Sequence, residues 1–261
     1  MAKRKRSKKK SKNKIYIIVF GIVAILVAFI FIIYSIRQKK EAARFALYPG
    51  FGIELPLGYK IHGIDVSSYQ GNIYWPAVAQ MQDQDVSIKF AFIKATEGLN
   101  KVDKQFYNNW QKAKAANIVR GAYHFFLATK SGRLQAQNFI KTVQLQPGDL
   151  PPVLDIEELY GVRPDSMRSR INAWLTAVEK AYNVKPVIYT NVSFYKNFLG
   201  HDFDDYPLWV AHYFVKKQPG VDEGWKFWQH NATGKINGIK TRVDFDVFSG
   251  DTTSFNNLLM H

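Results

Sequence analysis

Residues 151–158 read Pro-Pro-Val-Leu-Asp-Ile-Glu-Glu, an apolar run that ends in the carboxylates Asp155 and Glu157. Side chains two residues apart in a β-strand lie on the same face, so these two acids are expected to point the same way. In a closed parallel barrel that face is the interior, and its C-terminal end carries the chemistry. Two neighbouring acids there favour cleavage of a glycosidic bond. A strand end with a solvated acidic turn is the alternative, so other features must support the interpretation.

From residue 61 onward the chain alternates short apolar runs with amphipathic stretches, the pattern typical of parallel β/α units. Helices are predicted over 103–117, 134–145 and 164–182, whereas the gaps after Tyr213 and His230 are too short for full helices. We therefore predict an α/β fold, a TIM-like (β/α) barrel over residues 61–261 that is irregular in its last third. The eight predicted strands are 61–67, 90–96, 119–126, 152–157, 186–190, 208–212, 225–230 and 242–248.

Nearly every predicted strand carries a polar or aromatic side chain that suits a sugar. Eight consecutive strands that supply such groups to one rim favour a barrel active site over a core. Flat rings suit the CH-rich faces of sugars, so four aromatic residues are predicted to bind substrate together with Gln229, although core packing is the alternative for each ring. The groups are Asp65, Lys94 with Glu97, Tyr123 with His124, Asp155 with Glu157, Tyr189 with Asn191, Trp209 with Tyr213, Gln229, and Asp244.

Two of these positions have a second interpretation. Lys94 and Glu97 are expected to form a structural ion pair rather than to contact substrate directly. His124 is expected to be either a supporting hydrogen-bond donor for the site or a core histidine.

The N-terminus contains a run of 22 residues, 15–36, without a charge. As a helix this run would span about 33 Å, enough for a hydrocarbon core of ~30 Å. Nine Lys or Arg residues precede it and four follow within residues 37–44, so the positive-inside rule places the N-terminus in the cytoplasm. We predict a basic cytoplasmic tail (1–14), a single transmembrane helix (15–36), a juxtamembrane linker (37–60) and an extracytoplasmic catalytic domain.

A cleaved signal peptide is the alternative to a membrane anchor. The apolar run is longer than the usual core of about 7–15 residues, and no A-x-A-like site follows it before Arg37. These features favour permanent attachment to the cytoplasmic membrane.

Composition excludes several classes of function. Residues 1–44 hold 13 of the 36 basic residues and one of the 21 acids, which leaves 23 basic and 20 acidic residues, or about +3, for the rest. A nucleic-acid partner is therefore not predicted. The chain has no cysteine, which excludes disulfides and thiolate metal sites, and its six histidines show no metal-binding spacing. We expect neither a catalytic metal nor another cofactor.

Five segments in order resemble family 25 of the glycoside hydrolases, the phage and fungal type of lysozyme. The resemblance covers residues 61–248 and implies an irregular (β/α) barrel that cleaves the β-1,4 bond between N-acetylmuramic acid and N-acetylglucosamine in peptidoglycan. Asp246 departs from the pattern, because relatives more often carry Asn in a V-D-x-N-x-F segment. The segments are His-Gly-Ile-Asp-Val-Ser-Ser-Tyr-Gln-Gly (62–71), Phe-Ile-Lys-Ala-Thr-Glu-Gly (92–98), Gly-Ala-Tyr-His-Phe (121–125), Asp-Ile-Glu (155–157) and Val-Asp (243–244).

Glycoside hydrolysis needs an acid that stays protonated near neutral pH beside the leaving oxygen. Glu157 is predicted to be this acid, because it lies nearer the strand end and has the longer side chain. Asp65, Asp155 and Asp244 would raise its pKa and favour a positively charged transition state.

The residues leave two roles open for Asp155, a nucleophile or an orienter of the substrate 2-acetamido group, since sequence spacing does not give the carboxyl separation. The resemblance implies the second role, with assistance from Asp244. The alternatives for the whole protein are a hydrolase of chitin-like N-acetylglucosamine polymers and a cell-wall binding module without catalysis.

Overall fold

The computed structural model describes residues 16–33, 45–215, 218–221 and 224–261. The chain divides into two units, residues 1–43 and residues 44–261. In the first unit Tyr16–Ile33 forms one helix of 18 residues with a mean hydropathy of 3.2 and no buried residue. Such a helix is long and apolar enough to be a membrane anchor or a signal sequence. The predicted tail 1–14 and the ends of the predicted span, 15 and 34–36, lie outside the described residues.

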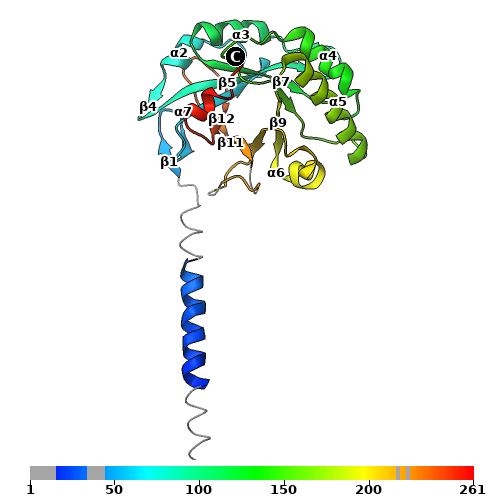
Figure 1. Ribbon diagram of the computed structural model, residues 1–261. Coiled ribbons are helices and arrows are strands. Elements are labelled where there is room, and N and C mark those ends of the chain that lie inside the picture. The colour runs from blue at the N-terminus through cyan, green and yellow to red at the C-terminus, as the bar shows by residue number, and fades with distance from the viewer. Residues whose placement is uncertain (1–15, 34–44, 216–217, 222–223) are drawn as a thin grey trace, which may run out of the picture. The chain divides into compact units, whose positions relative to one another are not determined.

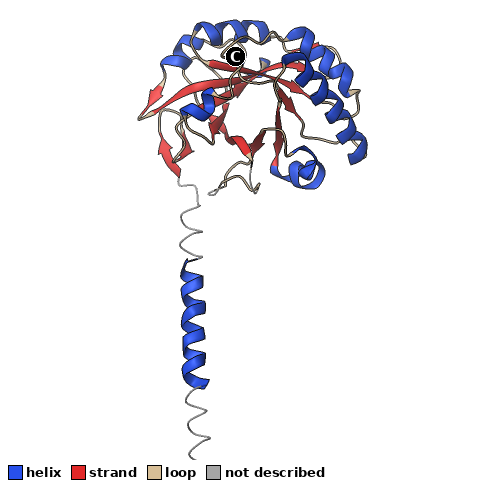
Figure 2. Ribbon diagram, viewed as in Figure 1, coloured by secondary structure: helices blue, strands red, loops and turns tan. Residues whose placement is uncertain are grey.

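The second unit is a barrel of strands whose longer helices lie along the top and right of the view, over one part of the barrel (Figures 1 and 2). The strands are β1 (Phe45–Tyr48), β2 (Ile53–Pro56), β3 (His62–Val66), β4 (Gln82–Asp83), β5 (Val86–Glu97), β6 (Lys101–Val102), β7 (Val119–Phe125), β8 (Val153–Asp155), β9 (Val187–Asn191), β10 (Leu208–Ala211), β11 (Trp225–Gly234) and β12 (Val243–Phe248). The α-helices are α2 (Trp75–Gln80), α3 (Phe106–Ala115), α4 (Gly132–Thr142), α5 (Pro164–Tyr182), α6 (Val192–Phe194) and α7 (Thr252–Asn256). Shorter turns are 3-10 helices at Ser68–Gln70 and Gly200–Phe203 and a π-helical turn at Tyr195–Leu199.

Eight of these strands close the barrel in the order β3-β12-β11-β10-β9-β8-β7-β5, with β5 pairing back to β3. Each overlaps one of the eight predicted runs, so the predicted fold class is confirmed, although β8 ends at Asp155 and the predicted strand 152–157 was therefore too long to be correct at Glu157. The expectation of parallel units is wrong for β12, which is antiparallel to both β11 and β3. Only residues 235–242 join β11 to β12, too few for the crossover of a dozen or more residues that a parallel pair needs.

A hairpin of β1 and β2 occupies part of the segment that we expected to be a linker. Phe51 in its turn is 0% exposed, and Ile53 and Leu55 of β2 are buried in the same hydrophobic cluster as the outer layer of the barrel. The apolar residues of the hairpin therefore belong to the core, and the compact unit includes residues 45–60 together with the predicted barrel.

Helix α5 illustrates why the helices cover the barrel. Pro164 occupies its first turn, where the missing N–H costs nothing, and Asn183 ends it in a left-handed conformation with φ 55°. Its buried side chains recur at helical spacing along one face: Met167, Ile171, Trp174, Leu175 and Val178. That face packs into the hydrophobic layer between the strands and the helices.

The barrel interior is filled by large rings that approach two glycines closely. A Cβ at Gly63 would lie 2.4 Å from the Phe90 ring, and one at Gly121 would lie 2.6 Å from the Phe92 ring. These glycines therefore give the rings the space they need. Phe92 stacks on Trp209 with ring centroids 4.3 Å apart, so the centre of the barrel is a packed floor rather than a channel.

Candidate active site

Strand alternation turns one set of side chains inward above this floor. Asp244 pairs in register with Asp65, although β12 runs in the opposite direction to β3. Asp244 lies near the start of its antiparallel strand, and this start reaches the rim where the parallel strands end. All catalytic candidates thus come to the same end of the barrel, Asp244 by a different route from the one we expected.

Asp155 ends β8, and Glu157 follows it two residues later. Their carboxyl groups are in hydrogen-bonding contact, which requires one proton between the two oxygens. Asp155 is 5% exposed, whereas Glu157 is open to solvent. Burial, and then the charge of Glu157, raises the pKa of Asp155 well above its usual range, and desolvation also raises the pKa of Glu157. The pair therefore has one buried and one accessible member.

Gln229 on β11 connects Asp65 to two tyrosines. Its Nε2 donates to Asp65 Oδ2 at 2.5 Å, and its Oε1 accepts from the hydroxyls of Tyr189 at 2.7 Å and Tyr213 at 2.5 Å. These bonds fix the orientation of the amide, because its oxygen accepts two donors and its nitrogen faces the carboxylate. Asp65 is thereby held at one place on the rim.

Two further acids lie beside Asp65. Desolvation raises the pKa of Asp244 to about 6, with a further contribution from the charge of Glu157. Asp246 is 0% exposed, and its Oδ1 accepts from Trp209 Nε1 at 2.8 Å. Asp65, Asp155, Glu157 and Asp244 thus bring four carboxyl groups to one end of the barrel, where their negative potential favours a cationic transition state, whereas Asp246 is enclosed beneath them.

Lys94 on β5 faces the acids and forms the predicted ion pair with Glu97, Nζ to Oε2, at 2.7 Å. Lys101 pairs with the other oxygen of Glu97 at 2.9 Å. Burial acts to raise the pKa of Glu97, but these two partners outweigh it and lower the pKa. The charge of Lys94 also lowers the pKa of Asp155 and Glu157, so this lysine opposes their protonation. The sequence indicated the ion pair but not this effect on the acids.

Some candidates lie elsewhere than expected. Trp209 is 2% exposed and lies between Phe92 and Tyr189, so it belongs to the floor and cannot offer a face to a sugar as predicted. Tyr189 is 7% exposed and is in contact with Trp209 in the same floor. Asn191 caps α6 by accepting from the Phe194 backbone N–H at 2.9 Å.

Tyr123 and Tyr213 remain the more accessible aromatic candidates. Tyr123 is half-buried and Tyr213 is 36% exposed. His124 is a core histidine with 0% exposure: it contacts Thr96 Oγ1 at 2.7 Å and stacks on Trp174. Burial lowers the pKa of His124 to about 3, so this ring stays neutral at the pH of ordinary function.

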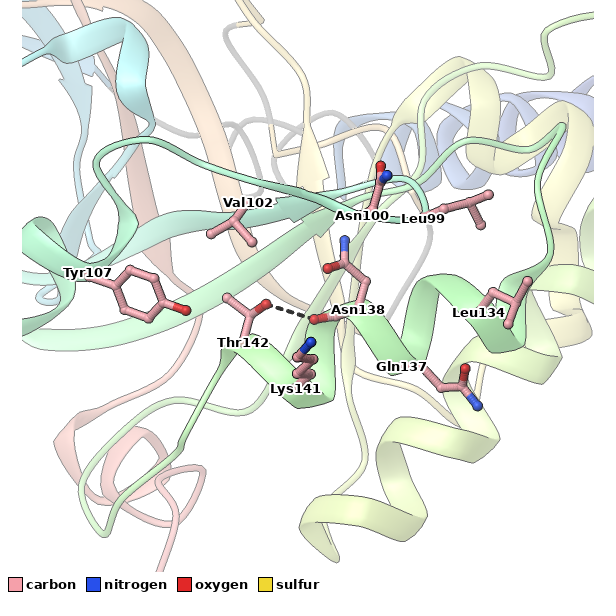
Figure 3. A pocket seen from close by; sticks show the side chains of 9 residues that line it. All are labelled: Leu99, Asn100, Val102, Tyr107, Leu134, Gln137, Asn138, Lys141 and Thr142. Atoms are coloured by element: carbon pink, nitrogen blue, oxygen red, sulfur yellow. Dashed lines mark hydrogen bonds between the residues drawn. The ribbon is translucent and has the colours of Figure 1, made fainter.

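Two hollows lie on the surface of the barrel unit, one near this site and one away from it. The first is lined by Lys94, Glu97 and the 74% exposed ring of Tyr69, so this open space adjoins the Lys94–Glu97 ion pair. The second lies between the segment after β5 and helix α4, where the Thr142 hydroxyl donates to the backbone oxygen of Asn138 (Figure 3). Its lining combines apolar, amide and hydroxyl side chains with Lys141 and includes no carboxylate, so it lacks the acids of the rim.

Comparison with known proteins gives concordant results. The model of glycosyl hydrolases family 25 matches residues 64–239. Over 200 residues the chain is 44% identical to the uncharacterized protein YegX of Escherichia coli, covering 77% of this chain and 74% of that one. Over 206 residues it is 37% identical to lysozyme M1 of Streptomyces globisporus, covering 73% of this chain and 68% of that one.

Solved structures agree with these matches. A family 25 glycosyl hydrolase from Bacillus anthracis superposes with a TM-score of 0.71 at 33% identity, covering 77% of this chain and 94% of that one. The bacterial lysozyme from Streptomyces coelicolor superposes with a TM-score of 0.69 at 35% identity, covering 77% and 98%.

Proposed function

Because this chain belongs to glycosyl hydrolase family 25 and is a glycoside hydrolase of the lysozyme type, we propose that it cleaves the β-1,4 bond between N-acetylmuramic acid and N-acetylglucosamine in peptidoglycan, with Glu157 as general acid and base. The contact between Asp155 and Glu157 is the observation that supports this assignment most directly. An accessible carboxyl with a raised pKa is what protonation of the leaving oxygen requires.

Asp155 assists the substrate 2-acetamido group in this proposal and does not attack the sugar. Its carboxyl is nearly enclosed and its pKa is raised, so it is a poor anionic nucleophile at neutral pH. Its Oδ1 is buried and has no hydrogen-bond partner among the described residues, so in this proposal substrate binding must bring the acetamido N–H to an oxygen that is enclosed in the free enzyme. Asp65 and Asp244 add negative potential as the sugar acquires positive charge.

Substrate binding falls to Tyr123 and Tyr213, which lie at the rim with exposed ring area. Tyr189 and Gln229 act from below by fixing the position of Asp65. Trp209 supports the floor through its contact with Phe92.

The direct test compares release of soluble fragments from purified peptidoglycan and from chitin. The wild type is expected to solubilise peptidoglycan and to leave chitin intact, and Glu157→Gln is expected to release nothing. Glu158→Gln is the matched control, because this neighbouring glutamate is also exposed and it is Glu157 that bonds Asp155. Chitin release would favour the polymer alternative. Binding of peptidoglycan without release by the wild type would favour a non-catalytic module.

We also propose that the Tyr16–Ile33 helix anchors the enzyme in the cytoplasmic membrane with the barrel outside, where it remodels the cell's own wall. The uniform exposure and apolarity of this helix support the proposal, together with the nine basic residues that precede it. Fractionation of cells is expected to find the full-length chain in the membrane. A soluble form that begins after about residue 36 would instead identify the helix as a signal sequence.

A further inference from the structure

Asp246 lies under the catalytic rim in a position without access to water. It faces the barrel interior from β12, in register with Gly63 on β3 and Gln229 on β11, and it is 0% exposed. A carboxylate in such a place is costly unless hydrogen bonds or an opposite charge compensate for its desolvation.

Only one of its two oxygens has a hydrogen-bond donor. Oδ1 accepts from Trp209 Nε1 at 2.8 Å, whereas Oδ2 has no partner among the described residues. The side chains of Asp246 and Asp65 are nevertheless in hydrogen-bonding contact. Two carboxylates have only acceptors, so such a contact needs a proton on one of them.

Gln229 donates to Asp65 and makes no hydrogen bond to Asp246 among the described residues. One of its two amide N–H groups donates to Asp65 Oδ2 at 2.5 Å, and its amide oxygen accepts from Tyr189 and Tyr213. A donor on Gln229 does not join one carboxyl group to the other, so the contact between Asp65 and Asp246 still requires a proton of its own.

Among the described residues, no cation compensates the charge of this pair. Asp244 lies on the same strand, and its negative charge acts on Asp246. Tyr213, which follows β10, is a neutral donor to Gln229. Asp155 from β8 adds a further negative contribution at Asp65. If both members of the pair ionised, two buried like charges would repel each other without compensation.

Building on the function proposed above, we propose that Asp65 and Asp246 form an acid pair that shares one proton, and that Asp246 is a positioning residue whose ionised form sets the alkaline limit of activity. With the proton present, the pair holds Asp65 beside Gln229 at the rim. When the proton is lost, repulsion separates the two carboxylates and displaces Asp65 from its working position. The proton leaves to solvent, and no other bond changes.

The experiment is a pH profile of kcat/KM on peptidoglycan for the full-length wild type and Asp246→Asn in detergent. The amide can accept from Trp209 and donate to Asp65, so it reproduces the protonated acid without titrating. The variant is expected to match the wild type at its optimum and to extend the alkaline limb by about one pH unit or more. Asp205→Asn, at an exposed position, is the matched control and is expected to leave the profile unchanged.

A second measurement separates this inference from the hydrolytic function. Burial raises the pKa of Asp246 in the folded state, so its protonated form contributes to the stability of the wild type at low pH. This contribution is lost as the pH rises through the folded pKa. The Tm of Asp246→Asn minus that of the wild type is therefore expected to increase as the pH increases. If neither protein cleaves peptidoglycan but the Tm difference widens, the acid pair stands and the proposed function fails. Superimposable alkaline limbs in active enzymes, or a constant Tm difference, would overturn the acid pair.

Discussion

Replacing Gln229 by Met tests whether its hydrogen bonds position the catalytic acids. Met has a similar volume, so the change removes three hydrogen bonds while leaving little cavity. The bonds from Tyr189 and Tyr213 contribute about 1 kcal/mol each and the one to Asp65 about 2, so the free energy of unfolding should fall by about 4 kcal/mol. A displacement of Asp65 of about 1 Å is expected to lower kcat/KM on peptidoglycan roughly 10²-fold.

Gln135→Met is the matched control for this substitution. Gln135 is also fully buried, and its amide bonds both backbone groups of Leu127, at 2.8 and 3.1 Å, on the helix side of the barrel. Both variants should lower the denaturant midpoint, but only Gln229→Met should lower kcat/KM per folded molecule. Equal activities of the two variants, after correction for the folded fraction, would refute a positioning role for Gln229.

Three further predictions concern the fold. Phe51→Ala should lower the free energy of unfolding, measured with denaturant, by about 3–5 kcal/mol because the ring is fully buried. Leu47→Ala, at a 59% exposed site of the same hairpin, should change this free energy little. Equal losses of stability in the two variants would exclude the hairpin from the core. Arg120→Met should cost about 3–5 kcal/mol because it leaves the 4% exposed carboxyl of Asp149 without its 2.8 Å partner, and a loss below about 1 kcal/mol would contradict this. Burial lowers the pKa of His230 to about 3, so on acidification this histidine is protonated first in the unfolded state, and the free energy of unfolding falls as the pH drops from about 6.5 towards 3. His230→Phe should reduce the slope of that fall by about 1.4 kcal/mol per pH unit. Parallel plots of unfolding free energy against pH for the two proteins would disprove this.

The strands of the barrel were predictable from the sequence because buried strands must be short and apolar. The hairpin was not predicted, since Pro49, Gly50 and Gly52 suggested a linker. The apolar residues Tyr48 and Phe51 were a signal that this segment has a core of its own. The antiparallel direction of β12 could have been deduced from the short connection after Gly234, which rules out a crossover.

The candidate site was only partly predictable, because sequence periodicity gives the face of a strand but not the depth of a side chain. Trp209 and Tyr213 both appeared suitable for sugar stacking, yet one is the floor and the other lies at the rim. Depth depends on which rings fill the barrel from other strands, here Phe92 above all. Asp246 attracted attention only as a departure from the family pattern, and its contact with Asp65 required the register between β12 and β3.

Identification of the new reducing ends in a peptidoglycan digest tests the central claim most directly. After borohydride reduction and acid hydrolysis, which also removes the N-acetyl groups, the wild-type digest is expected to contain the sugar alcohol of muramic acid, and the Glu157→Gln digest is expected to contain none above background. Reduced glucosamine in place of reduced muramic acid, or undiminished product from Glu157→Gln, would contradict the account.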